Sequence, residues 1–388
     1  YTQIPYLTII AVSVLPALLY FLTVAFFVRI EARKLNVAVG NNEGGPSTFE
    51  TLKSGWHFII PLIALIVSLI AGYTPVRSAT FAIFAVIGVS WMTGTPMTLE
   101  RCVDAILDAL RIMVPTAMLL VAVGLVVNVV TTTGLGNAFS VMIVDWAGGS
   151  LLMTLVLVAL ASLILGMGLL VTASYIVLAT LAAPALYDLI SQTVMLNALQ
   201  AADLPSNIQA VVNLFGGDPV RALAEMPAEM RQLVRSELLD PTLVTGMLLS
   251  AHLIIFWLSQ DSNVTPPVCL VAFTAAAIAG TPPMRTGLTS WKVAKGLYLV
   301  PLLFAFTPLV TGTWPERLTV FGFACLGLYS LAGILQWHLE EKLTVVTGPL
   351  LLASAFLLMW TPLGVVAHIA GAVMLIGVVS WQRYSAKH

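Results

Sequence analysis

The chain has 388 residues, of which 59% are hydrophobic and only 9% charged, with a net charge of -1 and a mean hydropathy of +0.99. A soluble domain carries about 25% charged residues, so water cannot be the main solvent of this chain. Its apolar runs instead match the thickness of a bilayer. The near-neutral charge, without a basic face, excludes a nucleic-acid-binding protein. We predict an all-α integral membrane protein, a multi-span helical bundle.

Residues 1–131 are predicted to hold scaffold or arm transmembrane helices. The apolar spans of this region are 5–30, 57–73, 79–95 and 112–131. A charged segment around Asp104 separates the third span from the fourth and is expected to lie at the membrane surface. Because the sequence opens at Tyr1 without an initiator Met, we expect the chain to be the C-terminal part of a longer polypeptide.

Residues 132–190 are predicted to contain a re-entrant hairpin. An apolar run at 150–165 is interrupted by the Gly-Met-Gly-Leu-Leu-Val-Thr-Ala-Ser segment at 166–174, and a second run follows at 175–189. Glycines and hydroxyl side chains make a poor continuous helix. Two short arms joined by an unwound tip explain this pattern better than one long helix does.

The polar residues 191–240 are predicted to form an amphipathic insertion outside the membrane. A broken transmembrane helix is predicted at 241–287, because Asp-Ser-Asn-Val-Thr-Pro-Pro at 261–267 interrupts the apolar run and its adjacent prolines remove two backbone donors. Residues 288–388 are expected to form plain C-terminal transmembrane helices.

The charges of the loops suggest an orientation. Cytoplasmic loops are enriched in Lys and Arg. If the hairpin is re-entrant, alternation of the spans places most Lys and Arg residues, including Arg285 and Lys342, on the cytoplasmic side. The hairpin then opens to the outer face, where residues 191–240 also lie.

Two interruptions at membrane depth predict a binding site, because non-helical backbone is tolerated there only inside protein or beside a watery cavity. Free carbonyl and hydroxyl oxygens suit a hard cation such as sodium, whereas packing kinks would need no ligand. The candidate residues for a sodium or substrate site are Gly166, Gly168, Thr172, Ser174, Asn263 and Thr265.

Two further residues near the second break have two interpretations each. Asp261 is either a functional intramembrane acid or a solvated residue at a helix end. His252 either relays protons or packs as an ordinary side chain. The sequence contains no Walker loop, HExxH or GxSxG motif, so we expect no enzyme, no catalytic residues and no cofactor apart from a sodium coupling ion.

Both breaks carry long ordered motifs. These are Leu-Gly-Met-Gly-Leu at 165–169, Thr-Ala-Ser-Tyr-Ile-Val-Leu-Ala at 172–179, Leu-Ala-Ala-Pro-Ala-Leu at 181–186, Val-Thr-Pro-Pro-Val at 264–268, Ala-Ala-Ala-Ile-Ala-Gly at 275–280 and Pro-Met-Arg-Thr-Gly at 283–287. With them the sequence resembles the large membrane subunit of TRAP transporters, the tripartite ATP-independent periplasmic family, in its fused four-plus-twelve-helix type associated with TAXI binding proteins.

This resemblance implies an elevator-type, sodium-coupled importer of organic acids in the inner membrane of a bacterium or archaeon. It implies three partners: a periplasmic substrate-binding protein of TAXI type, a small carboxylate substrate and membrane lipid. The family's inverted repeats each pair a re-entrant hairpin with a broken helix, and this sequence matches the second pair, which is half of the fold. The alternative function is a non-TRAP ion-coupled secondary carrier or a channel.

Overall fold

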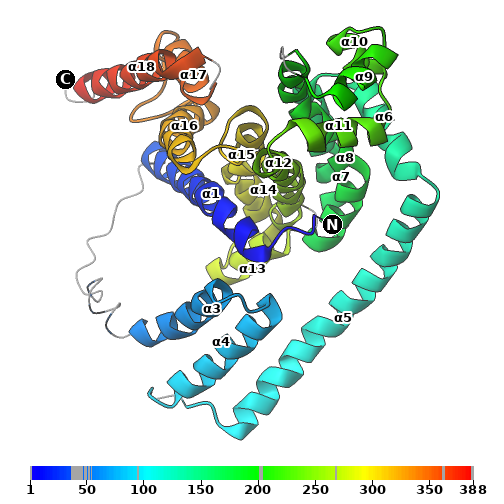
Figure 1. Cartoon of the computed structure of the whole chain (residues 1–388). Coiled ribbons are helices and arrows are strands. Elements are labelled where there is room, and N and C mark those ends of the chain that lie inside the picture. The colour runs from blue at the N-terminus through cyan, green and yellow to red at the C-terminus, as the bar shows by residue number, and fades with distance from the viewer. Residues whose placement is uncertain are drawn as a thin grey trace. The chain divides into compact units, whose positions relative to one another are not determined.

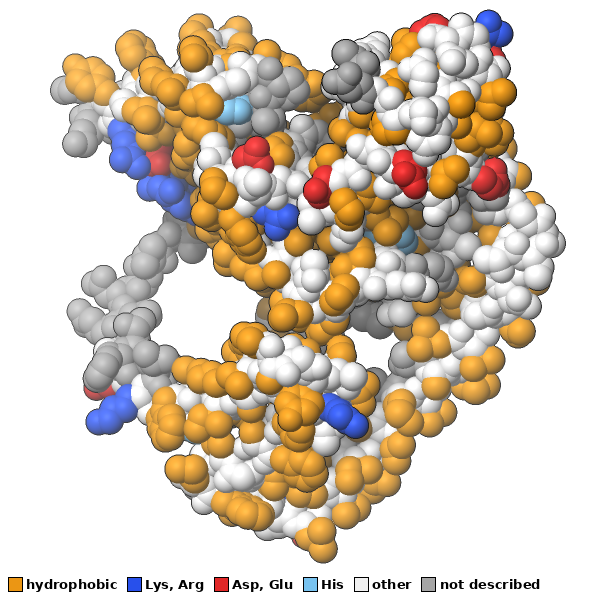
Figure 2. Space-filling view, in the orientation of Figure 1, with side chains coloured by type: hydrophobic (Ala, Val, Ile, Leu, Met, Phe, Trp, Pro, Cys, Tyr) orange, Lys and Arg blue, Asp and Glu red, His pale blue; other side chains and the backbone are white. Residues whose placement is uncertain are grey.

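The computed structural model describes residues 2–35, 47, 50, 53, 55–93, 96–200, 204–266, 269–360 and 363–385. Within these ranges the chain is almost entirely helical and has no β-strand (Figure 1). Hydrophobic side chains cover much of the visible surface, with charged side chains confined to small groups (Figure 2). The predicted all-α membrane protein is therefore confirmed.

Five helices of the described part are long and apolar enough to cross a bilayer. They are α1 (Tyr6–Lys34), α8 (Val171–Leu199), α12 (Pro241–Ser259) with the turn η2 (Gln260–Asn263), α16 (Trp314–Gln336) and α18 (Gly364–Ser385). The shorter apolar helices lie between them in the sequence.

The chain divides into two compact units, of which one comprises residues 3–11 and 38–122. In this unit η1 (Trp56–Phe58) leads into α3 (Ile59–Ile70), which packs on α4 (Pro75–Ser90). The predicted surface segment and fourth span form one continuous helix, α5 (Leu99–Thr132), whose last ten residues belong to the other unit.

The second unit holds residues 12–37 and 123–388 and contains both predicted breaks. Besides the long helices, its elements are α6 (Leu135–Trp146), α7 (Leu151–Gly166), α9 (Ser206–Leu214), α10 (Pro219–Glu225), α11 (Ala228–Leu238), α13 (Leu270–Ala279), α14 (Pro283–Val293), α15 (Gly296–Phe306) and α17 (Thr347–Met359).

The predicted hairpin consists of α7 and α8, which contact each other and are joined by the turn at 167–170. Its arms are unequal. With 16 residues α7 is about 24 Å long, less than a bilayer core of about 30 Å, whereas the 29 residues of α8 reach about 43 Å. On its other side α7 follows α6 after a bend of 119°.

The second arm continues past its predicted end at 189. Pro184 lies inside α8 without ending it, and the helix runs on to Leu199. The first nine residues of the predicted insertion therefore belong to α8. Met195 and Leu199 are buried against the short helices that follow, so burial of apolar surface outweighs the hydrogen bond lost at the proline.

The insertion itself folds into α9, α10 and α11, which pack back on α8. Their apolar side chains share one buried cluster with the end of α8 and the start of α12: Met195, Leu199, Ile208, Val212, Ala222, Leu223, Met226, Val234, Leu239 and Met247. This cluster fixes the three short helices as a structured cap instead of a loose loop.

The second break lies where the sequence predicts it. The α-helical hydrogen bonds of α12 end at Ser259, η2 follows as a 3-10 turn, and α13 begins only at Leu270. Pro266, like its neighbour at 267, has no backbone N–H to donate, which explains why the helix does not continue.

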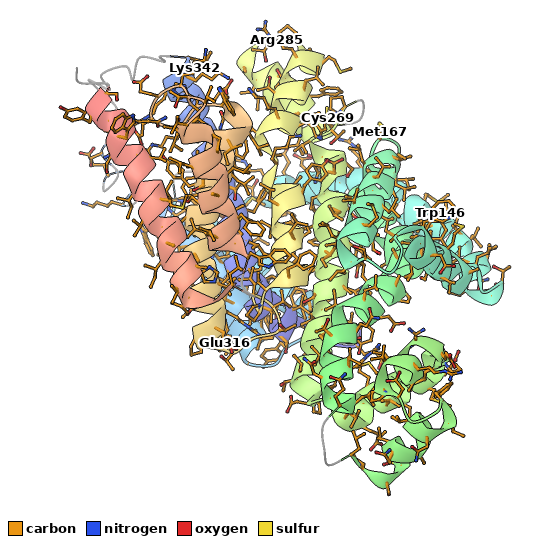
Figure 3. The ribbon with its side chains drawn as sticks, turned by 90° about the horizontal axis from the view of Figure 1, so that it is seen from above. Trp146, Met167, Cys269, Arg285, Glu316 and Lys342 are labelled. Atoms are coloured by element: carbon orange, nitrogen blue, oxygen red, sulfur yellow. The ribbon has the colours of Figure 1, made fainter. Side chains whose placement is uncertain are left out.

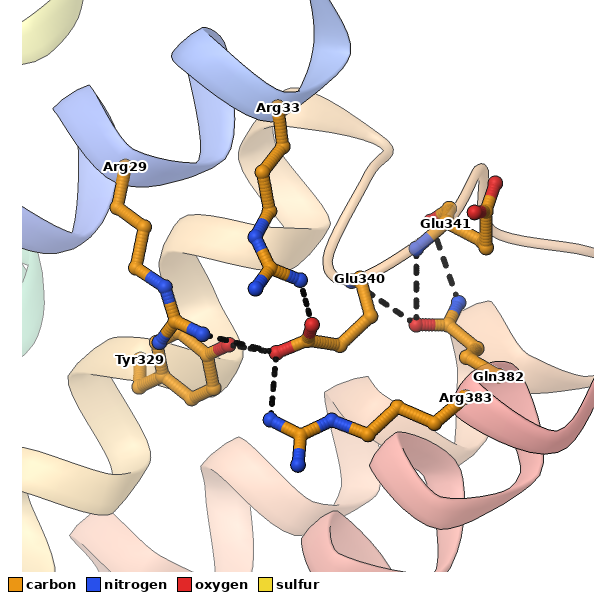
Figure 4. Close-up of polar contacts among 7 residues, drawn as sticks. All are labelled: Arg29, Arg33, Tyr329, Glu340, Glu341, Gln382 and Arg383. Atoms are coloured by element: carbon orange, nitrogen blue, oxygen red, sulfur yellow. Dashed lines mark hydrogen bonds and ion pairs between the residues drawn. The ribbon is translucent and has the colours of Figure 1, made fainter. Parts of the chain in front are cut away.

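At the C-terminal end of the chain, α16, α17 and α18 pack together and contact α1 through a polar cluster around Glu340 (Figure 4). The Glu340 carboxylate, in the loop between α16 and α17, pairs with Arg29, Arg33 and Arg383 and accepts a hydrogen bond from Tyr329. Segments more than 300 residues apart in the sequence are thereby joined.

The charged residues of this unit that Figure 3 labels lie toward opposite ends of its long helices. Arg285 and Lys342 lie toward one end of the unit, together with the hairpin turn at Met167, whereas Glu316 lies toward the other end (Figure 3). The insertion helices α9–α11 lie toward the Glu316 end. The orientation of these ends relative to a membrane stays a prediction.

Candidate functional site

The tip of the hairpin packs directly on the break in the other helix. A methyl group built on Gly166, the last residue of α7, would lie 3.2 Å from the backbone nitrogen and 3.5 Å from the Cβ of Ser262 in η2. Only glycine allows the two segments to approach so closely without displacement. The hairpin arm α8 contacts η2 as well. The two predicted breaks therefore form one region.

Several hydroxyl groups in or near this region are buried without a conventional partner. The Oγ atoms of Ser162 on α7 and Ser174 on α8 have no hydrogen-bond acceptor or donor among the described residues, and Ser174 is completely buried. Ser262 donates to the carbonyl oxygen of Ser259 at 3.2 Å. Buried hydroxyls are normally hydrogen-bonded, so these groups keep hydrogen-bonding capacity that the described residues do not use.

Asp261 brings a carboxylate into the same break. Its side chain is 1% exposed, and its Oδ1 accepts a hydrogen bond from the Tyr298 hydroxyl of α15, while Oδ2 has no partner among the described residues. Thr265 and Lys295 lie close enough to interact with the carboxylate. This burial contradicts the interpretation of Asp261 as a solvated residue at a helix end, whereas a function for the carboxylate stays a prediction.

Lys295 extends over an aromatic side chain at the edge of this site. Its Nζ lies 3.5 Å from the ring centroid of Trp291, whose Nε1 donates to the Tyr298 hydroxyl at 3.1 Å. Cation–π contact and the nearby Asp261 carboxylate compensate for the partial burial of the ammonium group. Asp261, Tyr298, Trp291 and Lys295 thus form a chain of polar contacts from the break toward α14.

The six predicted site residues do not all reach the buried contact. Gly166, Ser174 and Thr265 are buried, and Asn263 is half-buried with its amide donating to Gln260 Oε1 at 3.1 Å. Gly168 and Thr172 lie on the exposed side of the hairpin tip, and a Cβ on Gly168 would meet nothing within 4 Å.

The structure also brings to the break residues that the sequence did not predict as part of the site. Tyr298 and Lys295 lie about 35 residues beyond the break, in a segment that reads as a plain span. Lys295 directly precedes an apolar run, which was the available sign of a functional residue in the sequence, although a lysine in that place equally fits an ordinary helix end. Ser262 lies within the broken segment, but its contact with Gly166 depends on the packing of α7.

His252 of α12, for which the sequence allows two interpretations, lies in a cluster of aromatic side chains. Its Nδ1 is 3.1 Å from the Tyr175 hydroxyl, and the Tyr175 ring packs edge-on against Phe256. These contacts agree with a packed histidine. Within the described ranges, no three His, Cys, Asp or Glu side chains are grouped so that they could hold a metal ion.

Comparison with protein families gives a match to the tripartite ATP-independent periplasmic transporter, DctM component, over residues 1–313. The chain belongs to this family. A DctM component is the large permease subunit of a transporter that works with a periplasmic substrate-binding protein and a small membrane component. Comparison with curated proteins and with solved structures gave no match.

The family match ends just before α16, so the helices α16–α18 lie beyond it. It includes the hairpin, the insertion, the broken helix and α15 of this DctM component. All the residues of the contact between Gly166 and η2, together with Lys295 and Tyr298, are therefore inside the matched range.

Proposed function

We propose that this DctM component is the permease of a sodium-coupled importer of organic acids that receives its substrate from a periplasmic binding protein of TAXI type. It acts in the inner membrane of a bacterium or archaeon. The observation that carries the proposal is the close contact between the hairpin tip and the broken helix at Gly166 and Ser262. Paired discontinuous helices are the means by which secondary transporters bind ions and substrates at membrane depth.

Sodium fits the chemistry of the break. The 3-10 turn η2 and the segment after it leave backbone carbonyl oxygens outside the α-helical pattern, and hydroxyl oxygens of Ser174, Ser262 and Thr265 are buried near them. Asp261 adds a negative charge. Sodium prefers such hard oxygen ligands, and a cation would compensate for the burial of the second carboxylate oxygen.

An anionic substrate group fits the start of α8. Helix N-termini carry positive dipole ends and free backbone N–H groups. The N-cap residue Leu170 offers no side-chain acceptor to these groups, and α8 contacts η2. A carboxylate bound there would lie next to the sodium ion, which would couple the binding of the two solutes.

The proposal is tested by uptake of radiolabelled small carboxylates into proteoliposomes that hold the complete transporter. We expect uptake to require both an inward sodium gradient and the periplasmic binding protein. Uptake that is indifferent to the binding protein would favour the alternative of an ordinary carrier or channel. Uptake that needs the binding protein but not sodium would contradict the coupling ion.

A matched pair of variants locates the ion. Thr265→Val removes a buried hydroxyl from the break, and Thr289→Val removes an exposed hydroxyl from α14 that bonds only to its own helix. We expect Thr265→Val to raise the sodium concentration for half-maximal uptake about tenfold, the value of one hydrogen bond to a charged group. Thr289→Val should leave it unchanged.

A further inference from the structure

A second cavity, separate from the break, lies between α6, α8 and the insertion helices α10 and α11. Its volume is about 440 Å³, within the range of small-molecule sites. None of its lining residues belongs to α12, η2 or α15. It lies where the insertion helices α10 and α11 pack against α8.

Two arginines of α11 share a single carboxylate in this cavity. Arg235 donates from Nη2 to Asp188 Oδ1 at 2.6 Å, and Arg231 Nη2 lies 3.7 Å from Asp188 Oδ2. The Arg235 side chain is only 3% exposed, and its guanidinium lies 4.0 Å from the centroid of the Tyr187 ring. Such burial costs energy unless the positive charge is compensated.

The arginines keep unused donors in this position. The Nε atoms of both Arg231 and Arg235 are buried and have no hydrogen-bond partner among the described residues. Arg231 lies farther from Asp188 than Arg235 does and is only partly buried, so its terminal nitrogens remain accessible from the cavity. The planar donors of arginine match a carboxylate, which could bind there.

The rest of the lining limits what that carboxylate can belong to. Val141, Val144, Leu189 and Leu223 give the cavity apolar walls. Asp145, exposed at the end of α6, lines the same cavity, and it would repel a second carboxylate on the ligand. A ligand with one carboxylate and a short branched hydrocarbon chain satisfies both conditions.

We propose that the cavity between α6, α8, α10 and α11 is a binding site for a small apolar monocarboxylate, held by Arg231 and Arg235. This site is distinct from the sodium and substrate site at the break. The buried apolar cluster that joins α9–α11 to α8 keeps the arginines in place, so the site is formed before the ligand arrives.

The test is isothermal titration of isovalerate into the full chain in nanodiscs of zwitterionic lipid, in sodium-free buffer at pH 7.5. We expect saturable binding of one isovalerate per chain, weakened about tenfold in Arg231→Gln because one charge-assisted hydrogen bond is lost. Arg221→Gln is the matched control, since Arg221 is exposed on the same insertion and pairs with Glu225 at 2.8 Å. It should bind as the unmodified chain does.

Selectivity and location are tested in the same titrations. Succinate should bind at least about tenfold more weakly than isovalerate, and Asp145→Asn should narrow that difference. Thr265→Val at the break should not alter isovalerate binding. This result keeps the inference separate from the proposed sodium coupling, because the titration contains no sodium and measures no transport.

Three results would overturn the inference. The first is no isovalerate binding to the unmodified chain. The second is equal affinity in the Arg231 and Arg221 variants, and the third is loss of binding in Thr265→Val, which would place the ligand at the break. If isovalerate does not bind but Arg231→Gln weakens the affinity of the periplasmic binding protein, the arginines serve an acidic side chain of that partner instead.

Discussion

The junction around Glu340 and the contact between the hairpin and η2 both bury polar groups, but they differ in how completely those groups are hydrogen-bonded. Glu340 is surrounded by three arginines and a tyrosine, and Gln382 beside it bonds to the backbone of Glu340 and Glu341 (Figure 4). At the break, one oxygen of Asp261 and the hydroxyl of Ser174 have no hydrogen-bond partner within the part of the chain that the structure describes. A satisfied cluster fastens helices together, whereas an unsatisfied one leaves capacity for a ligand.

The largest effect should follow from removing the charge at the break. Asp261→Asn keeps the size of the side chain and an acceptor for Tyr298 but removes the negative charge that would attract sodium. We expect sodium-dependent uptake to fall about 100-fold, as for loss of a charged partner in a buried site. Asp218→Asn, at the exposed N-cap of α10, serves as the control. Equal uptake by the two variants would remove Asp261 from the mechanism.

A smaller effect should follow from separating the two segments. Gly166→Val places methyl groups against the backbone of Ser262, so the hairpin tip must move away from η2. We expect at least about a tenfold loss of uptake, because a displacement of about 1 Å at a site has a large cost. Gly168 lies two residues away, and a methyl group added there would meet no other atom within 4 Å. Gly168→Ala should therefore change uptake less than about twofold. If both variants transported equally well, close contact at the tip would be unnecessary.

The junction should respond in stability and not in sodium dependence. Glu340→Gln leaves three guanidinium groups without their shared carboxylate, and the loss of these charged hydrogen bonds costs about 1–3 kcal/mol. The thermal unfolding midpoint of the purified protein should fall, while the sodium concentration for half-maximal uptake stays the same. Glu341→Gln, the exposed neighbour, should unfold like the unmodified chain. A changed sodium response in Glu340→Gln would show that the two regions are coupled.

The smallest effect concerns the start of α12. The hydroxyl and backbone N–H of Thr242 donate to the Asp240 carboxylate and lower its pKa below the usual value. The lowered pKa means that ionised Asp240 stabilises the fold above the unfolded-state pKa of about 3.9, and that this stabilisation disappears as the pH falls through the folded value. Asp240→Ala should therefore unfold at a slightly lower temperature at pH 7, with the gap narrowing at pH 3.

A control variant checks that the effect comes from the helix cap. Asp104→Ala removes an exposed carboxylate from the second turn of α5, where it caps no helix. Its unfolding temperature should match that of the unmodified chain at both pH values. If the difference for Asp240→Ala were independent of pH, the loss of the hydroxyl hydrogen bond and not the charge would be its cause.

Local chemistry explains why the sequence located both breaks. Pro266 and its proline neighbour lack the N–H groups that a helix needs, and the glycines at 166 and 168 weaken the helix at the hairpin tip, whatever surrounds them. The end of the second run, predicted at 189, was wrong, because α8 runs on to Leu199 where Met195 and Leu199 are buried against the insertion helices. Propensity is decisive only where burial does not oppose it.

The sequence by itself determined that this chain is a helical membrane protein, because a chain so hydrophobic and so poor in charged residues cannot fold with its surface in water. The sequence also determined where the backbone must leave the helix. Only the tertiary structure decided which of the predicted residues meet. It buried Gly166 against Ser262, left Gly168 and Thr172 exposed, and brought Tyr298 to Asp261. Such contacts depend on how distant helices pack, which no local pattern of residues contains.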